Sequence, residues 1–226
     1  MQARDQTPKR GGTLTSLIIE DQPGFLIHEA ATTSVLWPMM PRYSNLVLFD
    51  QLKARETLET VVPELAERWS WQNNYRNLVF FLRKSVRWHD GRPFTSRDVK
   101  YTFDVVHEAK DAPAKLRLRP QPSLLRMLAA GYSPVLPAHI PIADLRQRCV
   151  GPGPFKEKQY LGGQVVELER NPDYFLPGRP YLDGLRYLII TERSTRLAAL
   201  QANRLDAFIP LDMTKTMAED KRDQQE

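Results

Sequence analysis

Cysteine is almost absent from this sequence, because Cys149 is the one cysteine among 226 residues. A single thiol excludes an internal disulfide framework and a cysteine-rich zinc module. No apolar run approaches the ~18 residues that a membrane-spanning helix needs. The segment from Met1 to Arg10 is polar and charged, so the signal segment of an exported protein is not present in this sequence. Its absence does not place the protein in the cytoplasm, because a targeting segment can be missing from the sequence.

Signatures of catalysis and metal binding are also missing. There is no GK[ST] of a P-loop, no GxSxG nucleophile elbow, and no HExxH or HxH pattern among the four histidines. Neighbouring residues of a strand point to opposite faces, so His89 beside Asp90 is interpreted as a histidine entering a turn rather than an acid–base pair. For Cys149, with no organised histidine partner, a buried or incidental thiol is favoured over a nucleophile. We expect no enzyme activity, no cofactor and no metal.

Charge is plentiful and slightly basic. Lysine and arginine outnumber aspartate and glutamate by 32 to 27, which gives a formal net charge of +5. One basic cluster stands apart, with no acidic residue between Asp111 and Asp144; it consists of Lys115, Arg117, Arg119 and Arg126. Such a cluster could hold phosphates, but no aromatic residues are interleaved with it. We therefore favour a solvated surface strip and expect no nucleic-acid partner.

Periodicity and turn residues predict a mixed α/β protein. Strands are expected at 13–19, 78–83, 86–88, 165–170, 185–190 and 205–209, and an apolar element at 46–52. Helices are expected at 96–109 and 194–202, with a helix-capable stretch at 25–35. Thr95 and Asp98 resemble a capping box, and Asn203 stands where the chain should turn left-handed. The segment 214–226 has few apolar residues and is expected to fray.

The four tryptophans divide into two groups. Trp69, Trp71 and Trp88 lie in regular apolar patterns and are predicted to be core residues. Trp37 instead begins an irregular stretch, WPMMPRY, which also contains Met39, Met40, Arg42 and Tyr43. A loop rich in Trp, Met and Tyr suits a pocket wall, because these side chains offer adaptable apolar contact. Packing in the core, or between lobes, is an equally open interpretation of this stretch.

Three blocks of sequence, in this order, carry a resemblance to one family. They are KRGGTLTS at 9–16, PELAERWSW with LVFFLRKSVRWHDGRPFTSRDVKYTF at 63–71 and 78–103, and GPGPFKEKQYLGGQVVELERNPDYFLPGRPYLDGLRYLII at 151–190, leading into TRLAALQANRLDAF at 195–208. The chain resembles the solute-binding components of ABC transporters of the dipeptide, oligopeptide and nickel class. VRWHDGRPFTSRDV is the most specific block, and the matches span most of residues 9–209.

The resemblance implies a two-lobed, periplasmic-binding-protein-like (type II) fold that closes over a peptide or other small solute. Such a protein delivers the solute to a membrane permease, does no chemistry, and works as a monomer in the periplasm or, membrane-associated, outside the cell. Segments 1–45 and 141–213 would form first-lobe elements, and 46–140 a smaller subdomain. The family's cleft loop corresponds here to the residues Trp37, Met39, Met40, Arg42 and Tyr43. Ser133 is a weaker candidate for the same cleft.

Three departures from the family qualify this expectation. The family is about twice this length, so the second lobe is expected to be missing. The segment 110–118 is too short by about a helix end and a strand, and Asn203 replaces a usual glycine. Two functions stay open: a solute-binding module, and a truncated half-protein with a structural or interaction role. With one lobe, we expect weak or undetectable binding of peptides or metal chelates.

Overall fold

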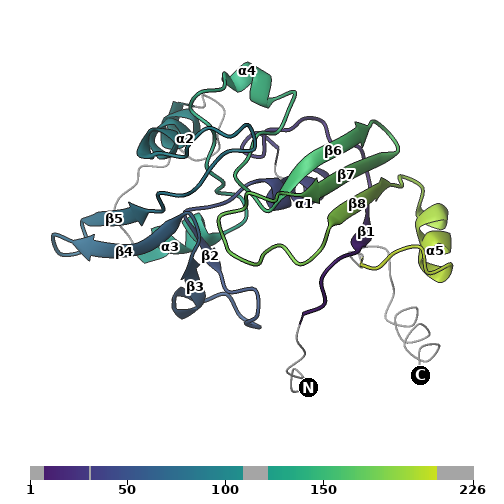
Figure 1. Cartoon of the computed structure of the whole chain (residues 1–226), viewed down its shortest axis with the longest axis horizontal. Helices are drawn as coiled ribbons and strands as arrows, with labels where there is room; N and C mark the ends of the chain where they lie inside the picture. Colours follow the sequence, from purple (N-terminus) through teal and green to yellow (C-terminus); the bar gives the residue numbers. More distant parts are fainter. Residues whose placement is uncertain (1–7, 31, 109–121, 208–226) are drawn as a thin grey trace.

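A four-stranded sheet organises one part of the molecule (Figure 1), in a computed structural model that describes residues 8–30, 32–108 and 122–207. Its strand order is β1-β8-β7-β6. The strands are β1 Thr13–Ile18, β6 Phe155–Leu161, β7 Val165–Arg170 and β8 Gly184–Ile189. β1 pairs with β8 in parallel, with Thr13 opposite Gly184, and the other two pairings are antiparallel. The N-terminal strand is thus joined to a strand from far along the chain.

Three of these strands follow the apolar pattern of the sequence. The strands expected at 13–19, 165–170 and 185–190 are confirmed to within one residue at each end. β6 was not expected, because its sequence FKEKQYL is polar and only Phe155 at its start is buried. An edge strand with one face in solvent gives too weak an alternation to be recognised from sequence.

The segment between β1 and β6 forms two separate strand pairs and includes helices α2 and α3. β2 Val47–Phe49 pairs with β3 Val61–Pro63, and β4 Ala66–Gln72 pairs with β5 Asn77–Leu82. The hairpin β4–β5 extends away from the four-stranded sheet (Figure 1). Helices α2 Ser96–Glu108 and α3 Pro122–Ala129 lie beside these pairs, and a short 3₁₀ helix, η2 Leu58–Thr60, precedes β3. The expected strand at 78–83 and helix at 96–109 are confirmed within the described residues.

The capping interaction of α2 is confirmed in detail. The backbone N–H of Thr95 donates to Asp98 Oδ2 at 2.7 Å, and Thr95 Oγ1 accepts from the N–H of Arg97 at 3.2 Å. The second carboxylate oxygen of Asp98 accepts from the N–H of Ala138 at 2.8 Å. Asp98 therefore caps the start of the helix, where backbone N–H groups lack helical partners and need an acceptor. The same carboxylate also holds the segment 137–139 against the helix.

Two expected strands are wrong in the described residues. Residues 86–88 form only a single bridge, Arg87 to Pro93, because the turn at Asp90 and Gly91 (φ +85°) leaves no room for a ladder. Of the strand expected at 205–209, residues 205–207 are not in a strand; the N–H of Asp206 instead donates to Thr15 O at 2.8 Å. Residues 208 and 209, the tail 214–226 and the basic residues Lys115, Arg117 and Arg119 lie outside the described residues.

The C-terminal helix and its end are confirmed. Helix α5 spans Arg193–Gln201, as the sequence predicts for 194–202, and a short helix α4, Ile142–Leu145, precedes the 151–154 turn. Asn203 has a φ of +53°, which confirms its expected left-handed conformation. Asparagine tolerates this conformation better than other residues with a side chain, and so ends the helix in place of a glycine.

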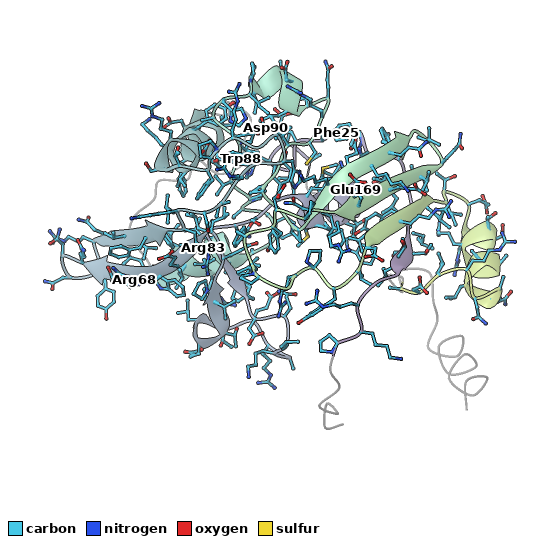
Figure 2. All side chains as sticks on the ribbon, viewed as in Figure 1. Phe25, Arg68, Arg83, Trp88, Asp90 and Glu169 are labelled. Carbon is cyan, nitrogen blue, oxygen red and sulfur yellow. The ribbon has the colours of Figure 1, made fainter. Side chains whose placement is uncertain are left out.

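The largest buried cluster takes side chains from both parts of the chain. We call residues 46–140 the middle segment. The cluster joins Phe25 and Leu36, which precede β2, to Leu65 and Trp88 of the middle segment and to Leu145, which follows it. Figure 2 shows Phe25 and Trp88 in the crowded centre and Arg68 on the extended hairpin. Trp88 is confirmed as a core residue. The division into 1–45 with 141–213 and 46–140 matches the separate sheets but stays a prediction, because this core crosses it.

The remaining two tryptophans are less buried than expected. Trp69 is half-buried and packs against the cluster around Val47 and Leu125. Trp71 is half-buried near the end of the β4–β5 hairpin, with its ring 5.8 Å from that of Tyr75. Trp71 is therefore not a core residue, because a two-stranded hairpin offers packing to only part of each face.

Candidate functional site

The stretch expected to be an irregular loop is helical. Helix α1 spans Thr33–Met39 and continues into a 3₁₀ helix, η1 Met40–Arg42. Pro38 lies inside α1, and Pro41 lies in the first turn of η1. Proline at a first turn loses no hydrogen bond, because the N–H groups there have no helical partner. Pro41 is therefore compatible with η1, whereas Pro38 removes one hydrogen bond near the end of α1, and the loop prediction for 37–43 is wrong.

Arg42 lies at the centre of the molecule rather than on a surface. Its side chain is fully buried, and Nη1 donates to Glu157 Oε2 of β6 at 2.7 Å. Its guanidinium stands 5.8 Å from the ring centroid of Phe25. Within the described residues its Nε and Nη2 atoms have no hydrogen-bond partner. In this conformation the Arg42 side chain offers no surface to a solute, and its hydrogen bond joins η1 to β6.

The backbone of Arg42 explains the glycines of the 151–154 turn. A Cβ on Gly151 would lie 1.8 Å from Arg42 O, and one on Gly153 would lie 2.4 Å from Arg42 C. The N–H of Gly153 donates to Arg42 O at 3.0 Å. Only glycine permits this approach, so the turn is a packing device between η1 and β6.

His89 ties the same turn to the middle segment. Its backbone N–H donates to Gly151 O at 2.9 Å, and its Nε2 lies 3.1 Å from Gly153 O. Burial lowers the pKa of His89 to about 4, so the ring is neutral at pH 7 and Nε2 is the donor. Asp90 turns away and pairs with His139 at 2.7 Å. The interpretation of His89 as a turn residue is confirmed.

Two more of the predicted site residues are interior. Met39 has no exposed surface and Tyr43 is 3% exposed; both belong to the largest core cluster. Burial raises the pKa of the Tyr43 hydroxyl well above its usual value, and burial also raises the pKa of the nearby Cys149 thiol to about 11. Cys149 is therefore a protonated, unreactive thiol at neutral pH. Met39 and Tyr43 offer no surface to a solute in this conformation.

Trp37 and Met40 remain accessible on the same helical segment. Trp37 is half-buried and packs against the cluster of the four-stranded sheet, beside residues such as Val166. Met40 is 45% exposed. Its side chain crosses to the middle segment, since a Cβ on Gly131 would lie 2.1 Å from Met40 Cε. Met40 is thus where the first-lobe segment meets the turn that contains Ser133.

The turn 131–133 is held in place by α3. Ser133 Oγ donates to Met127 O at 2.8 Å, and Asn45 Nδ2 donates to Ala130 O at 2.7 Å. Two further exposed apolar side chains belong to this region, Met127 at 47% and Tyr132 at 57%. We name Met40, Met127 and Tyr132 the junction patch. Met127 and Tyr132 were not among the predicted site residues, although a tyrosine between Gly131 and Ser133 was a usable signal.

Ser133 also lines a cavity of about 540 Å³ between residues 26–29 and the middle segment. Met127 and Tyr132 share this lining with apolar side chains of α2 and α3, among them Val106 and Leu128. The exposed ion pair of Glu29 with Arg146 stands at its rim, with Arg146 Nη2 2.6 Å from Glu29 Oε1. Met40 and Ser133 therefore both lie at the turn 131–133. Met39, Arg42 and Tyr43 are instead buried in the interior.

In the described ranges, no three histidine, cysteine or acidic side chains gather in a way that could hold a metal ion. No helix among those residues is long and apolar enough to cross a membrane.

Comparison with known sequences identifies the family of this chain. The model of "Bacterial extracellular solute-binding proteins, family 5 Middle" matches residues 60–123 and 110–226, which is well over half of the chain. The oligopeptide-binding protein AppA of Bacillus subtilis is 33% identical over 165 residues, covering 60% of this chain and 30% of AppA. A putative ABC transporter peptide-binding protein of Brucella ovis is 30% identical over 206 residues, covering 78% of this chain and 37% of that protein. This chain spans about a third of the length of these relatives.

Solved structures agree with the fold. The structure of AppA from Bacillus subtilis with a nonapeptide superposes with a TM-score of 0.73 at 26% identity, covering 89% of this chain and 44% of AppA. MoaA of A. tumefacien R10, a binding protein in complex with mannopinic acid, gives a TM-score of 0.77 at 25% identity, with 89% and 45% covered. The expected mixed α/β architecture of the periplasmic-binding-protein type is confirmed for the part of that fold that this chain contains.

Proposed function

Because this chain belongs to family 5 of the bacterial extracellular solute-binding proteins, we propose that it takes part in solute capture for an ABC importer. The solute would be a peptide or a related small molecule, and a membrane permease would receive it. The names of the relatives support this class, since AppA is called oligopeptide-binding and the Brucella ovis protein is called an ABC transporter peptide-binding protein. MoaA, with mannopinic acid, supports keeping the class of solute wider than peptides.

The proposal includes where and how the protein works. It would act outside the cytoplasm, in the periplasm or membrane-associated on the outer face, as a monomer without nucleic acid. It would bind and release its solute unchanged, without enzymatic chemistry. Membership of a family described as solute-binding supports this non-catalytic role.

The main support for the location of the solute site is the junction patch. Exposed thioether and phenol side chains gather where η1 meets the turn 131–133, and they leave adaptable apolar surface in solvent. Solute pockets are lined mainly by such side chains, with few polar groups to fix orientation. We propose that Met40 and Tyr132 contact the solute, with Trp37 and Ser133 beside them. Met39, Arg42 and Tyr43 would support this wall from beneath.

A second function is favoured by the burial of those three residues. Half of the predicted contacts lie inside the molecule, so the three that remain accessible form one wall of a site rather than surrounding a solute. A pocket normally buries ~70–90% of a small ligand, and a single wall forfeits much of that contact. The alternative is a truncated, structural or interaction half-protein that binds no solute independently.

The two functions differ in a titration that is sensitive to millimolar affinity. Labelled chain of residues 1–226 is titrated with a mixed di- to pentapeptide library and followed by NMR. Losing ~4 kcal/mol of contact moves micromolar binding to millimolar, since 1.4 kcal/mol is tenfold. We expect weak, saturable shifts at Met40 and Tyr132, which Met40→Ala reduces. Leu161→Ala is the matched control, because Leu161 is similarly exposed, at 41%, on the β6–β7 hairpin.

Each outcome selects between the proposals. Shifts that are absent at millimolar peptide would favour the half-protein. A dissociation constant at or below ~1 μM, about 8 kcal/mol, would contradict our account that one wall is insufficient. Binding that Met40→Ala leaves unchanged would retain the function but reject this site.

A further inference from the structure

The outer edge of β5 carries an unusual run of apolar residues. The five residues Leu78 to Leu82 are all apolar, and each is half-buried. β5 pairs only with β4, and no described segment hydrogen-bonds to its other edge. Open, apolar edge strands readily pair with another chain, and proteins normally cover or charge them. This edge is neither covered by described residues nor charged along its length.

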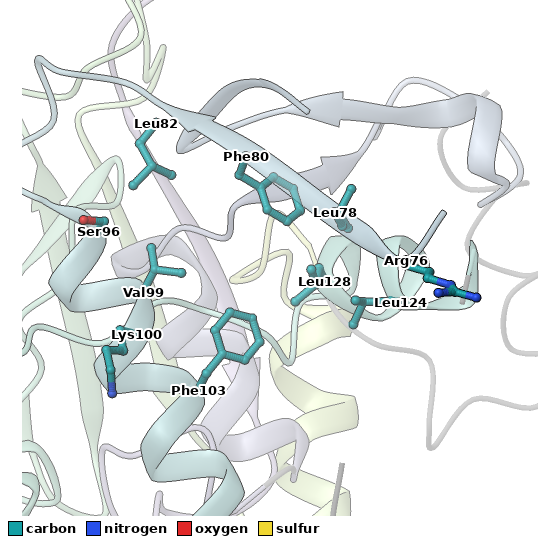
Figure 3. A pocket seen from close by; sticks show the side chains of 10 residues that line it. All are labelled: Arg76, Leu78, Phe80, Leu82, Ser96, Val99, Lys100, Phe103, Leu124 and Leu128. Carbon is teal, nitrogen blue, oxygen red and sulfur yellow. The ribbon is translucent and has the colours of Figure 1, made fainter. Parts of the chain in front are cut away.

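A groove runs beside this strand (Figure 3). It has a volume of about 470 Å³, and Leu78, Phe80 and Leu82 of β5 form one side of it. Side chains of α2 and α3 form the other side, among them Phe103 and Leu128. An added strand would therefore find backbone partners on β5 and an apolar slot for alternate side chains. These two components define recognition by strand addition.

Charge indicates which strand would fit. The sequence from 72 to 84 contains no acidic residue, while Arg76 precedes the apolar run and Arg83 and Lys84 follow it. Arg83 is half-buried and its Nε donates to Glu64 O at 2.6 Å. Arg76 and Lys84 are exposed, and their side chains form no hydrogen bond or ion pair with the described part of the chain. Both ends of the open edge thus present cations.

The same charges disfavour a second copy as the occupant. In an antiparallel pair of two β5 strands, Arg76 of one copy would face Arg83 or Lys84 of the other. In a parallel pair, each cation would face its own equivalent. Like charges directly opposite each other destabilise a strand pair. A strand with acidic residues at both ends would instead place opposite charges across the pair and stabilise it.

We propose that β5 and the adjoining groove bind an extended apolar segment of another polypeptide that carries acidic residues at both ends. The segment adds a third strand to the β4–β5 hairpin, places alternate side chains in the groove, and pairs its terminal carboxylates with Arg76 and Lys84. This surface lies on the middle segment and uses none of the residues of the junction patch, so the inference goes beyond solute capture.

The test uses the full chain and two labelled heptapeptides, acetylated and amidated, in which three valines alternate with two threonines. One peptide ends in aspartates and the other in lysines. We expect fluorescence anisotropy at low salt to show at least tenfold tighter binding of the aspartate peptide. Arg76→Glu should remove this preference, whereas Arg204→Glu, an equal charge change at the end of α5, should not. Amide hydrogen exchange should show new protection within 78–82 on binding.

Three results would overturn the proposal. The first is equal affinity for both peptides. The second is full protection of the 78–82 amides in the free chain, which would mean that the chain already covers this edge. The third is protection that grows with protein concentration alone, which identifies a second copy. Met40→Ala separates this site from the solute site: if it abolishes peptide binding, the peptide lies at the junction patch and only the strand-addition proposal fails.

Discussion

Arg42 and Glu157 form an ion pair of unequal partners: the arginine side chain is fully buried, and the glutamate side chain is 34% exposed. The pair joins η1 to β6 across 115 positions of sequence. It therefore connects the start of the chain to the return into the four-stranded sheet.

Removing the glutamate should be costly. Glu157→Ala leaves a buried guanidinium without its counter-charge, and we expect a loss of roughly 3 kcal/mol of unfolding free energy. Glu167→Ala is the control, because its partners Lys158 and Arg186 are at least half exposed and should contribute less than ~1 kcal/mol. Urea unfolding of the three proteins gives the comparison. Equal losses would contradict the structural role assigned to Arg42.

Replacing Gly151 with alanine should also destabilise the protein strongly. Gly151→Ala places a Cβ against a backbone oxygen that cannot move away alone, so we expect a loss of at least ~3 kcal/mol. Gly162→Ala is the matched change, because its Cβ would lie 3.4 Å from Asp21 Oδ2, at ordinary contact, and should alter stability by less than ~1 kcal/mol. Thermal melts of both variants check this. A Gly151→Ala protein as stable as the parent would refute the close approach.

A rise in pH from about 4.5 to 8 should destabilise the protein through Glu64. This carboxyl group is 5% exposed, and burial raises its pKa to about 8 although it accepts the N–H of Asn45 at 2.6 Å. The folded state therefore holds a proton that the unfolded state releases near pH 4.5, so stability falls by a few kcal/mol as the pH rises from 4.5 to 8 and levels off above 8. Glu64→Gln keeps an acceptor for Asn45 and should remove most of this pH-dependent loss of unfolding free energy between pH 5 and pH 9, as denaturant unfolding at a series of pH values measures. A parent profile already flat in that window would show Glu64 to be ionised.

Acid should destabilise the protein through His89, with the opposite sign. The pKa of His89 is lowered from 6.5 to about 4, so the stability of its neutral form is complete above pH 6.5 and is lost as the pH falls towards 4. The loss should reach about 3 kcal/mol or slightly more, at 1.4 kcal/mol per pKa unit. His89→Gln should lower stability at pH 7 but lose less between pH 6.5 and pH 4. Denaturant titrations at a series of pH values measure both slopes, and parallel slopes for the two proteins would argue against a buried neutral ring.

The parts of the fold that the sequence predicted are those with local causes. Residues that favour strands, set between turn residues, identified β1, β7 and β8, and the Thr95–Asp98 capping box located the start of α2. The polar β6 and the proline-containing α1 were missed, because one has a solvent-facing pattern and the other contains residues that usually mark loops.

The candidate site was predicted less well, for a physical reason. The burial of Arg42 depends on Glu157, and the contact of Met40 depends on Gly131, and neither partner is near in sequence. Trp, Met, Arg and Tyr suit a pocket wall and a buried junction equally, so composition could not separate the two. Ser133 was found through a family resemblance alone, and its neighbour Tyr132 was overlooked.

The parallel pairing of β1 with β8 also sets an order of events at the ribosome. Gly12 and Asp183, which hydrogen-bond at the start of this pairing, stand 171 positions apart. The strand synthesised first consequently has no sheet partner until almost the whole described chain has emerged. During that interval β6 and β7 can pair as a hairpin from neighbouring sequence. β1 can join the sheet only once β8 has been made, so its docking is a late and non-local step of sheet formation.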